Sequence, residues 1–311
     1  MSRIAWSVAV LAVALGAQEP VVESKVVDTP ATSNGATEVY KRIGDVELTM
    51  QLVTPAGHTA TDRRPAVVFF FGGGWTQGRI DQFRPQAEYL ASRGMVAALA
   101  DYRVRSRHGT TPFECVADGK SAVRWLRANS ERLGIDARRI AAGGGSAGGH
   151  VAAATGVLPG LDEVGEDTEV SARPDALLLF NPVFDNGPTG YGHDRVKARW
   201  REISPLHNLG EGAPPTIVFL GTKDSLIPVA TARDYEQRMK KAGARCDLHL
   251  YEGEPHGFFN RERSARSYAL TVREMDRFLV SLGWLDGEPT IEVPEQKPAP
   301  KPAAKPAKSG G

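Results

Sequence analysis

Ser146 is the residue whose setting most directly suggests chemistry. It lies in the pattern Gly-x-Ser-x-Gly, after an apolar run at 140–142 that predicts the end of a strand and before small residues at 147–155 that predict a helix. A serine on such a turn, the nucleophile elbow, has strained backbone angles and an exposed hydroxyl, and the flanking glycines leave room for the neighbouring strand and helix. The amide of Ala147, at the helix start, would point toward a developing oxyanion. This stretch predicts a nucleophilic serine.

The same glycines also fit two other interpretations. Gly143, Gly145 and Gly148 have the spacing of the dinucleotide-binding fingerprint, and a plain turn is also compatible with a chain that holds 33 glycines. The fingerprint belongs on the first strand of its fold, with an acidic residue at the end of the next strand. Here several predicted strands come earlier, and the next one ends at Asn181, with Asp185 beyond it. These features disfavour a nucleotide-dependent oxidoreductase.

A serine hydroxyl is a weak nucleophile and needs a positioned base. His256 follows the apolar run 246–251, and Asp224 follows the run 216–220. The imidazole could take the proton of Ser146 while the carboxylate fixes the imidazole tautomer. Taken singly, Asp224 fits a helix cap and His256 fits a surface loop. Together they have the chain order Ser, Asp, His of hydrolases built on such an elbow, which favours a triad.

Three glycines at 72–74 follow the apolar run 66–71 and precede Trp75. Without side chains in the way, their amides can approach a substrate oxygen, so one or two of them together with the Ala147 amide would form an oxyanion hole. A phosphate cradle is the alternative for these glycines alone.

The elements that must position these residues alternate between apolar runs and helical patterns. An opening hairpin is expected at 37–43 and 46–54, and the later strands at 66–71, 95–100, 140–142, 175–180, 216–220 and 246–251. Helices are expected at 83–92, 113–133, 147–155, 229–242 and 265–282. This alternation predicts an α/β fold, with a mostly parallel central sheet of about eight strands and helices on both faces. Functional groups then gather past the carboxyl ends of the strands.

Composition and charge exclude some classes of partner and suggest how the chain divides. The 311 residues are 41% hydrophobic with a formal net charge of +1, which gives no bulk electrostatic case for nucleic acid or an anionic membrane. We expect one catalytic domain at 37–285. A linker at 18–36 would precede it, and a disordered tail rich in Pro, Ala and Lys at 286–311 would follow it.

The N-terminus has the outline of a signal peptide at residues 1–17. Arg3 precedes an apolar run at 4–15, and small residues follow it, so cleavage is expected after Gly16 or Ala17. The run is short for a membrane span, and an uncleaved anchor is the alternative. The sequence predicts a secreted or periplasmic protein with no stable membrane insertion once the signal is cleaved.

The cysteines and two of the histidines are expected to be structural. Cys115 and Cys246 form neither a disulfide framework nor a zinc pattern, so buried free thiols are expected, and no metal is predicted. His249 alternates within a strand, and His150 lies four residues past Ser146 on its helix.

Taken together, several motifs resemble the α/β-hydrolase superfamily over about residues 38–284. The resemblance is to acetyl esterases and hormone-sensitive-lipase-like esterases, including carbohydrate-linked feruloyl and acetylxylan esterases. It implies Ser146 as nucleophile, Asp224 as acid partner and His256 as base, with Gly73, Gly74 and Ala147 as oxyanion donors. The motifs are Phe71-Gly72-Gly73-Gly74-Trp75, Asp101-Tyr102-Arg103, Ser121-Ala122-Val123-Arg124-Trp125, Gly134-Ile135-Asp136 ahead of Arg139-Ile140, Gly145-Ser146-Ala147-Gly148-Gly149, Asp224 with Pro228, and His256-Gly257-Phe258.

One departure from the family concerns Phe71, which stands where the family usually has histidine before the three glycines. Because that histidine is thought to brace the loop rather than do chemistry, we expect an altered loop in an active enzyme. The family also implies that the segment 158–209, with its acidic stretch at 162–169, forms one side of the substrate cleft. Aromatic faces suit acyl chains and sugar rings, so the expected walls are Trp75, Tyr191, Trp200 and Phe258, with simple burial as the alternative for each.

The resulting expectation is a secreted serine carboxylic-ester hydrolase that works through an acyl-enzyme and needs no metal or cofactor. Its substrate would be a small-molecule or saccharide ester, such as a short acyl (acetyl) or feruloyl ester of a carbohydrate. A serine peptidase of the same fold is one alternative, since the triad alone does not choose ester over amide. A non-catalytic binding protein on a hydrolase scaffold is the other.

Overall fold

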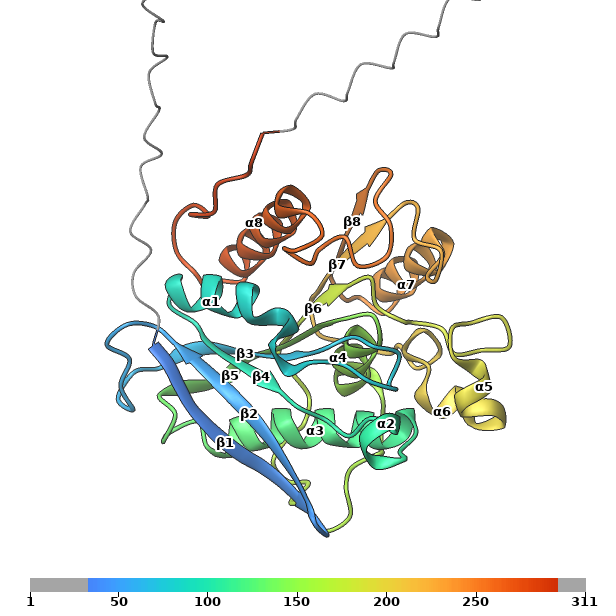
Figure 1. Cartoon of the computed structure of the whole chain (residues 1–311), viewed down its shortest axis with the longest axis horizontal. Coiled ribbons are helices and arrows are strands. Elements are labelled where there is room, and N and C mark those ends of the chain that lie inside the picture. Colours follow the sequence, from blue (N-terminus) through green and yellow to red (C-terminus); the bar gives the residue numbers. More distant parts are fainter. Residues whose placement is uncertain (1–32, 296–311) are drawn as a thin grey trace, which may run out of the picture.

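The computed structural model describes residues 33–295, which form one sheet covered by helices (Figure 1). The strands are β1 (Ser33–Ile43), β2 (Val46–Thr54), β3 (Arg64–Phe70), β4 (Val96–Ala100), β5 (Ile135–Gly145), β6 (Ala176–Phe180), β7 (Thr216–Gly221) and β8 (Cys246–Tyr251). The longer helices are α1 (Arg84–Ser92), α3 (Pro112–Ala128), α4 (Ala147–Val157), α7 (Val229–Lys241) and α8 (Ala265–Ser281). Short helical turns are α2 (Arg105–His108), α5 (His193–Val196), α6 (Trp200–Ile203), η1 (Ile80–Phe83), η2 (Lys197–Arg199) and η3 (Pro205–His207).

The eight strands lie in the order β1-β2-β4-β3-β5-β6-β7-β8. β2 is antiparallel to β1 and β4, and every pair from β4 across to β8 is parallel. The mostly parallel sheet of about eight strands predicted from the sequence is therefore confirmed. Its carboxyl ends share one edge, where β3, β5, β7 and β8 lead into the segments that carry the candidate site residues.

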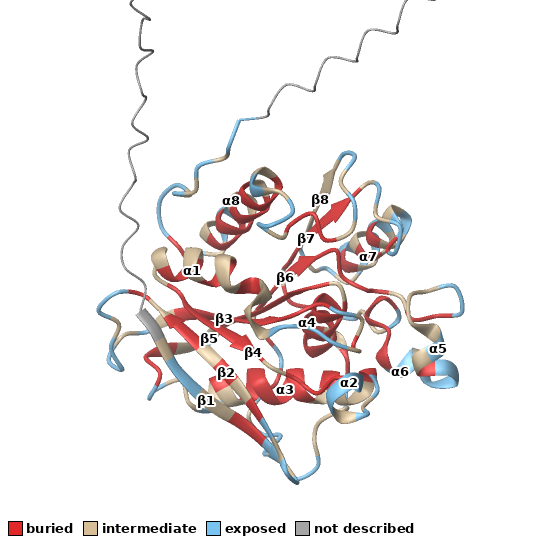
Figure 2. Ribbon diagram, viewed as in Figure 1, coloured by how far each residue is buried: buried red, intermediate tan, exposed pale blue. Residues whose placement is uncertain are grey.

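The central strands are apolar because helices cover both of their faces. All residues of β4, β6 and β7 are buried, as strands with two covered faces require (Figure 2). On one face, α3, α4 and α7 contribute to a core with residues such as Val123, Val151 and Met239. On the other face, α1 and α8 pack through residues such as Leu90 and Val272.

Local signals fix where α3 begins and ends. Thr111 caps it reciprocally with Glu114, and Pro112 occupies its first turn, where no N–H is needed. The sequence predicted a helix to residue 133, but α3 ends at Ala128, and turns lead to Gly134 (φ +62) and into β5.

The structure refines two of the expected domain limits. β1 begins at Ser33, inside the stretch expected to be a linker. Residues 286–295, expected to belong to a disordered tail, lie against the α1/α8 side: Ile291 and Val293 pack on that core, and Arg93 donates to the Asp286 carbonyl at 2.8 Å. The predicted signal peptide at 1–17, linker residues 18–32 and tail residues 296–311 lie outside the described residues.

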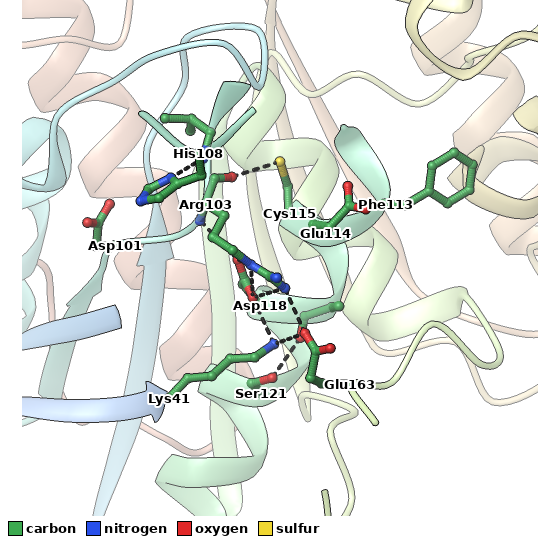
Figure 3. Close-up of polar contacts among 12 residues, drawn as sticks. Lys41, Asp101, Arg103, His108, Phe113, Glu114, Cys115, Asp118, Ser121 and Glu163 are labelled. Carbon is green, nitrogen blue, oxygen red and sulfur yellow. Dashed lines mark hydrogen bonds and ion pairs between the residues drawn. The ribbon is translucent and has the colours of Figure 1, made fainter. Parts of the chain in front are cut away.

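A buried cluster of charges joins β1, α3 and two loops. The amine of Lys41 contacts Asp118 at 2.7 Å and Glu163 at 2.8 Å, and the Arg103 guanidinium contacts the same two carboxylates at 2.8 and 2.6 Å (Figure 3). The Asp118 side chain is fully buried. Two cations and two anions thus balance one another and hold the loop that carries Glu163 against α3.

A neighbouring group of ion pairs extends the same attachment. Arg124 of α3 contacts Asp162 at 2.5 Å and also bonds Glu166. Three carboxylates of the acidic stretch at 162–169, which the family resemblance placed beside a substrate cleft, are therefore paired with cations on or next to α3; they belong to Asp162, Glu163 and Glu166. No residue of 162–169 lines the cavity over Ser146, so this part of the expectation is wrong, whereas Tyr191 and Arg195 of the same segment 158–209 do line it. Cations of α3, β1 and the Arg103 loop attract the three carboxylates to the helix instead.

Both cysteines are free, as expected. Cys115 is buried and Cys246 is half-buried. Burial raises the pKa of the Cys115 thiol well above its ordinary value and that of Cys246 to about 12, so both stay protonated near neutral pH. Within residues 33–295, every helix falls short of the length and apolarity needed to cross a bilayer.

Candidate active site

Ser146 occupies the sharp turn between β5 and α4. Its backbone angles are φ 55 and ψ −119, a conformation that is strained for any residue with a side chain. The flanking glycines are required by close approach. A Cβ at Gly148 would lie 2.1 Å from the Phe70 carbonyl oxygen, and one at Gly144 would lie 2.6 Å from the same atom. The turn thus holds the serine hydroxyl out from the sheet at the head of α4.

The fold brings Ser146, His256 and Asp224 into one line. His256 Nε2 lies 3.0 Å from Ser146 Oγ, and His256 Nδ1 lies 2.7 Å from Asp224 Oδ2. Asp224 follows β7 and His256 follows β8, and parallel pairing of these strands puts both loops at one sheet edge. This is the spacing that proton transfer from a hydroxyl to an imidazole needs.

The surroundings of Asp224 fix which nitrogen of His256 carries a proton. The carboxylate is fully buried. Its second oxygen, Oδ1, accepts the backbone N–H groups of Leu226 and Ile227, each at 2.9 Å. An ionised carboxylate accepts only, so His256 Nδ1 donates to it, and the Nε2 lone pair faces the Ser146 hydroxyl. Asp224 therefore also stabilises its own turn, the role considered for it in isolation.

The glycine loop after β3 lies beside the serine. Gly73 (φ +128) and Gly74 (φ +62) line the same cavity as Ser146, and Ala147 is the first residue of α4, where N–H groups have no acceptor within the helix. Gly72 differs, because its N–H donates to Gln82 Oε1 at 2.6 Å.

Phe71, the residue before the glycine loop, is held in place by contacts with Tyr102 and Gly78. Its ring stacks on that of Tyr102, with centroids 4.2 Å apart, and the Tyr102 hydroxyl donates to the Phe71 carbonyl at 2.7 Å. Gly78 lies so close that a Cβ there would be 2.1 Å from the ring. An apolar stack thus occupies the position where the resembling family usually has histidine.

The cavity over Ser146 has a volume of about 380 Å³. Of the four aromatic residues expected to wall it, Tyr191 does so. Trp75 and Phe258 are each 1% exposed, and their expected place in the wall is wrong. The indole N–H of Trp75 donates to buried His150 at 3.3 Å, and Phe258 packs in the α1/α8 core beside Tyr251. Large aromatic rings are stabilised by burial in the core, and both of these rings are buried there instead of facing the cavity.

Trp200 is also outside the cavity wall. Its ring meets that of His207 edge-on, with centroids 4.7 Å apart, and packs on a small cluster that contains Val196 and Ile203. His150 is structural as expected, since Nε2 contacts the Ile203 carbonyl at 2.9 Å and burial lowers the pKa of the imidazole to about 4. The tertiary contacts of these side chains, rather than their chemistry, remove them from the cavity.

Several residues at the site escaped the sequence analysis. Arg195 and Arg263 line the cavity, as do Gln82 and Asn260. Asn181, buried at the end of β6 with φ +36, accepts the Gly257 N–H through Oδ1 at 2.8 Å and so fixes the loop next to His256. Asn181 could have been identified from the sequence, because it comes immediately after a predicted strand. The other four lie in loops or turns with no distinguishing pattern.

No group of three His, Cys, Asp or Glu side chains within residues 33–295 is arranged to hold a metal ion. The candidate site itself consists of a hydroxyl, an imidazole, one buried carboxylate and a loop of backbone amides. These are the parts of a nucleophilic acyl-transfer site.

Comparison with known proteins gives two family matches. A family described as BD-FAE matches residues 50–183, and the dienelactone hydrolase family matches residues 191–281. Esterase LipC of Mycobacterium tuberculosis is 31% identical over 220 residues, which are 64% of this chain and 54% of LipC. The chain thus matches about half the length of this curated relative.

Solved structures of Thermogutta terrifontis esterase 2 are similar over nearly their whole length. The form phosphorylated by paraoxon is 44% identical, with a TM-score of 0.78, and the match covers 84% of this chain and 98% of that one. The butyrate-bound form is 44% identical, with a TM-score of 0.77 and coverage of 83% and 96%.

Proposed function

Because the chain belongs to the α/β-hydrolase family of esterases, we propose that it hydrolyses carboxylic esters with Ser146 as nucleophile, His256 as general base and acid, and Asp224 as its partner. The observation that carries the proposal is the line from Ser146 Oγ through the imidazole of His256 to Asp224, with separations of 3.0 and 2.7 Å.

In the first half of the reaction, Ser146 Oγ attacks the ester carbonyl carbon while its proton passes to His256 Nε2. The carbonyl oxygen becomes an oxyanion, and the new positive charge on the imidazole faces the buried Asp224 carboxylate. His256 then gives the proton to the leaving alkoxide oxygen, which departs as the alcohol. The serine is left as an acyl-enzyme.

The second half repeats these steps with water. His256 removes a proton from the water as it attacks the acyl carbon, and returns that proton to Ser146 Oγ when the carboxylic acid leaves. We assign oxyanion stabilisation to the amides of Gly73, Gly74 and Ala147. The positive φ values of the two glycines and the position of Ala147 at the start of α4, where amides have no acceptor within the helix, support this assignment.

The substrate proposed is a short acyl ester of a small molecule or a saccharide. The cavity of about 380 Å³ and a similar esterase solved with butyrate bound support a short acyl chain. Acetyl or feruloyl esters of carbohydrates, as in acetylxylan, are proposed from the sequence resemblance. The secreted or periplasmic location is proposed from the N-terminal pattern.

The proposed role of Ser146 is tested by replacing it with alanine and by making the same replacement at a control serine outside the site. Ser146→Ala should abolish turnover of p-nitrophenyl acetate and labelling by a fluorophosphonate probe, with an unchanged circular dichroism spectrum. Ser92→Ala is the control, because Ser92 lies on α1 and bonds the Tyr89 carbonyl in its own helix. Turnover that persists in Ser146→Ala would remove the assignment, and an unlabelled wild-type protein would favour a non-catalytic scaffold.

Substrate class is measured on the same preparations. A series of p-nitrophenyl esters from acetate to octanoate should show activity falling with chain length. Acetylated and feruloylated saccharides test the alcohol, and matching p-nitroanilides test the peptidase alternative. Faster cleavage of the anilides than of the esters would contradict the proposal.

A further inference from the structure

Two arginines lie in the wall of the cavity over Ser146, and none of the wall residues within the described range 33–295 is acidic. Arg195 comes from α5, and Arg263 comes from the loop ahead of α8. Both are separate from the three side chains to which the proposed mechanism assigns steps. The proposed mechanism therefore gives no role to these two positive charges.

Contacts hold the two guanidinium groups at different sides of the cavity. Arg195 Nη1 donates to the Gly74 carbonyl, and its guanidinium carbon lies 5.6 Å from the ring centroids of both Trp75 and Tyr191. Arg263 Nη1 donates to the His256 carbonyl at 3.0 Å. One cation is thus fixed beside the glycine loop and the other beside the histidine loop.

Neither guanidinium forms an ion pair with a carboxylate in the described part of the chain. Asp81 and Glu262 line an adjoining cavity that Arg263 also lines, and Asp81 is paired with Arg79 at 2.7 Å. Asp194, next to Arg195, is exposed; both residues line a second cavity, but no ion pair joins them. By contrast, Arg103 and Arg124 in the clusters around α3 are each paired with two carboxylates.

We propose that this cavity selects esters that carry a second, ionised carboxylate, with Arg195 as its principal partner and Arg263 adding attraction from the histidine side. A guanidinium fork matches carboxylate geometry, and its pull is strongest where water is partly excluded, as at half-buried Arg195. The inference rests on the proposed esterase function and names its substrate class. The carboxylate can belong to the acyl part, as in a dicarboxylic monoester, or to the alcohol, as in a uronate-bearing saccharide.

Two matched pairs of esters distinguish a carboxylate on the acyl part from one on the alcohol. The alcohol pair is the butyrate esters of 3-hydroxybenzoate and 3-hydroxybenzamide. The acyl pair is the p-nitrophenyl esters of adipic acid and of its monoamide. In at least one pair, wild-type kcat/KM should be about tenfold higher for the carboxylate than for the carboxamide, and the ratio should fall in high salt.

Variants assign the preference to Arg195. In Arg195→Gln the ratio should fall toward one, and Arg195→Lys should keep part of it. Arg199→Gln, which removes a surface arginine paired with Glu202 at 2.6 Å, should keep the wild-type ratio. If Arg195 merely braced the glycine loop, both members of a pair would slow equally. A wild-type ratio of one or less in both pairs, or an unchanged ratio in Arg195→Gln, overturns the inference.

A binding measurement makes the result independent of turnover. Titration of Ser146→Ala with the same intact esters by calorimetry should give tighter binding of the carboxylate in the preferred pair, and Ser146→Ala/Arg195→Gln should lose the difference. Absence of hydrolysis in the wild type with this binding preference intact would reject the esterase function alone. Equal binding of carboxylate and carboxamide in both pairs would reject the anion preference.

Discussion

The side chain of Gln82 accepts the backbone N–H of Gly72 at 2.6 Å. Its other end, Nε2, donates to Asn260 Oδ1 at 3.0 Å, and Asn260 Nδ2 donates to the Gly257 carbonyl at 2.8 Å. One continuous chain of hydrogen bonds therefore joins the glycine loop to the loop that follows His256. Gln82 sets the position of the proposed oxyanion donors relative to the proposed base.

Gln82→Leu should lower kcat for p-nitrophenyl butyrate about tenfold while KM changes little, because the glycine loop loses its fixed placement relative to the attacking serine. Gln82→Glu keeps an acceptor for Gly72 but loses the donor to Asn260, so its loss should be smaller. Steady-state kinetics with a thermal melt of each variant checks this. Equal kcat in wild type and Gln82→Leu would show that the network does not position the loop.

Asp224→Asn should reduce kcat by about 10⁴-fold with a near-native fold. The amide can still accept the N–H groups of Leu226 and Ile227, but its other end can donate to His256 and favour the wrong imidazole tautomer. Asp234→Asn, which removes a surface partner of Arg238, is the control and should stay near wild type. The measurement is kcat on p-nitrophenyl acetate. A loss of tenfold or less would argue against Asp224 as the partner of His256.

His150 should make stability depend on pH in mildly acidic solution. Burial lowers the pKa of its imidazole to about 4, against about 6.5 in the unfolded chain, so the unfolded state binds the proton first. Stability is then fully present above about pH 6.5 and falls as the pH drops toward 4, by about 3 kcal/mol in all. Protonation would also place an N–H on Nδ1 against the Trp75 indole N–H.

Urea unfolding of wild type and His150→Asn between these pH values measures the effect. The variant should show a shallower slope of unfolding free energy with pH, whatever its absolute stability. His249→Asn, on edge strand β8, serves as the comparison and should retain the wild-type slope. Parallel slopes for wild type and His150→Asn would contradict the assignment.

Asp118→Asn should destabilise the fold by about 3–5 kcal/mol, because it leaves Lys41 and Arg103 buried with Glu163 as their remaining carboxylate. Asp136→Asn, whose partners Arg138 and Arg139 are more exposed, should cost less than about 1 kcal/mol. Chemical unfolding at neutral pH compares the two. Similar losses would show that the cluster of Figure 3 is no more important than a surface pair.

The sequence by itself determined the sheet, the elbow turn and the order of the three residues that meet at its edge. These depend on short-range rules: apolar runs make buried strands, glycines permit the turn at Ser146, and parallel strands bring their carboxyl ends together. Asp224 and His256 could be chosen because each follows a recognisable strand. No comparable pattern marks Gln82, Arg195 or Arg263.

Only the tertiary structure decided which side chains face the cavity. Trp75 and Phe258 have aromatic rings that could contact a substrate, and they lie beside site residues in the sequence. Both rings are nevertheless buried in the core, whereas Tyr191 lines the cavity over Ser146. The acidic stretch at 162–169 was drawn to α3 by cations whose proximity depends on long-range packing. Exposure and charge pairing result from contacts between segments far apart in the chain, and local patterns do not encode them.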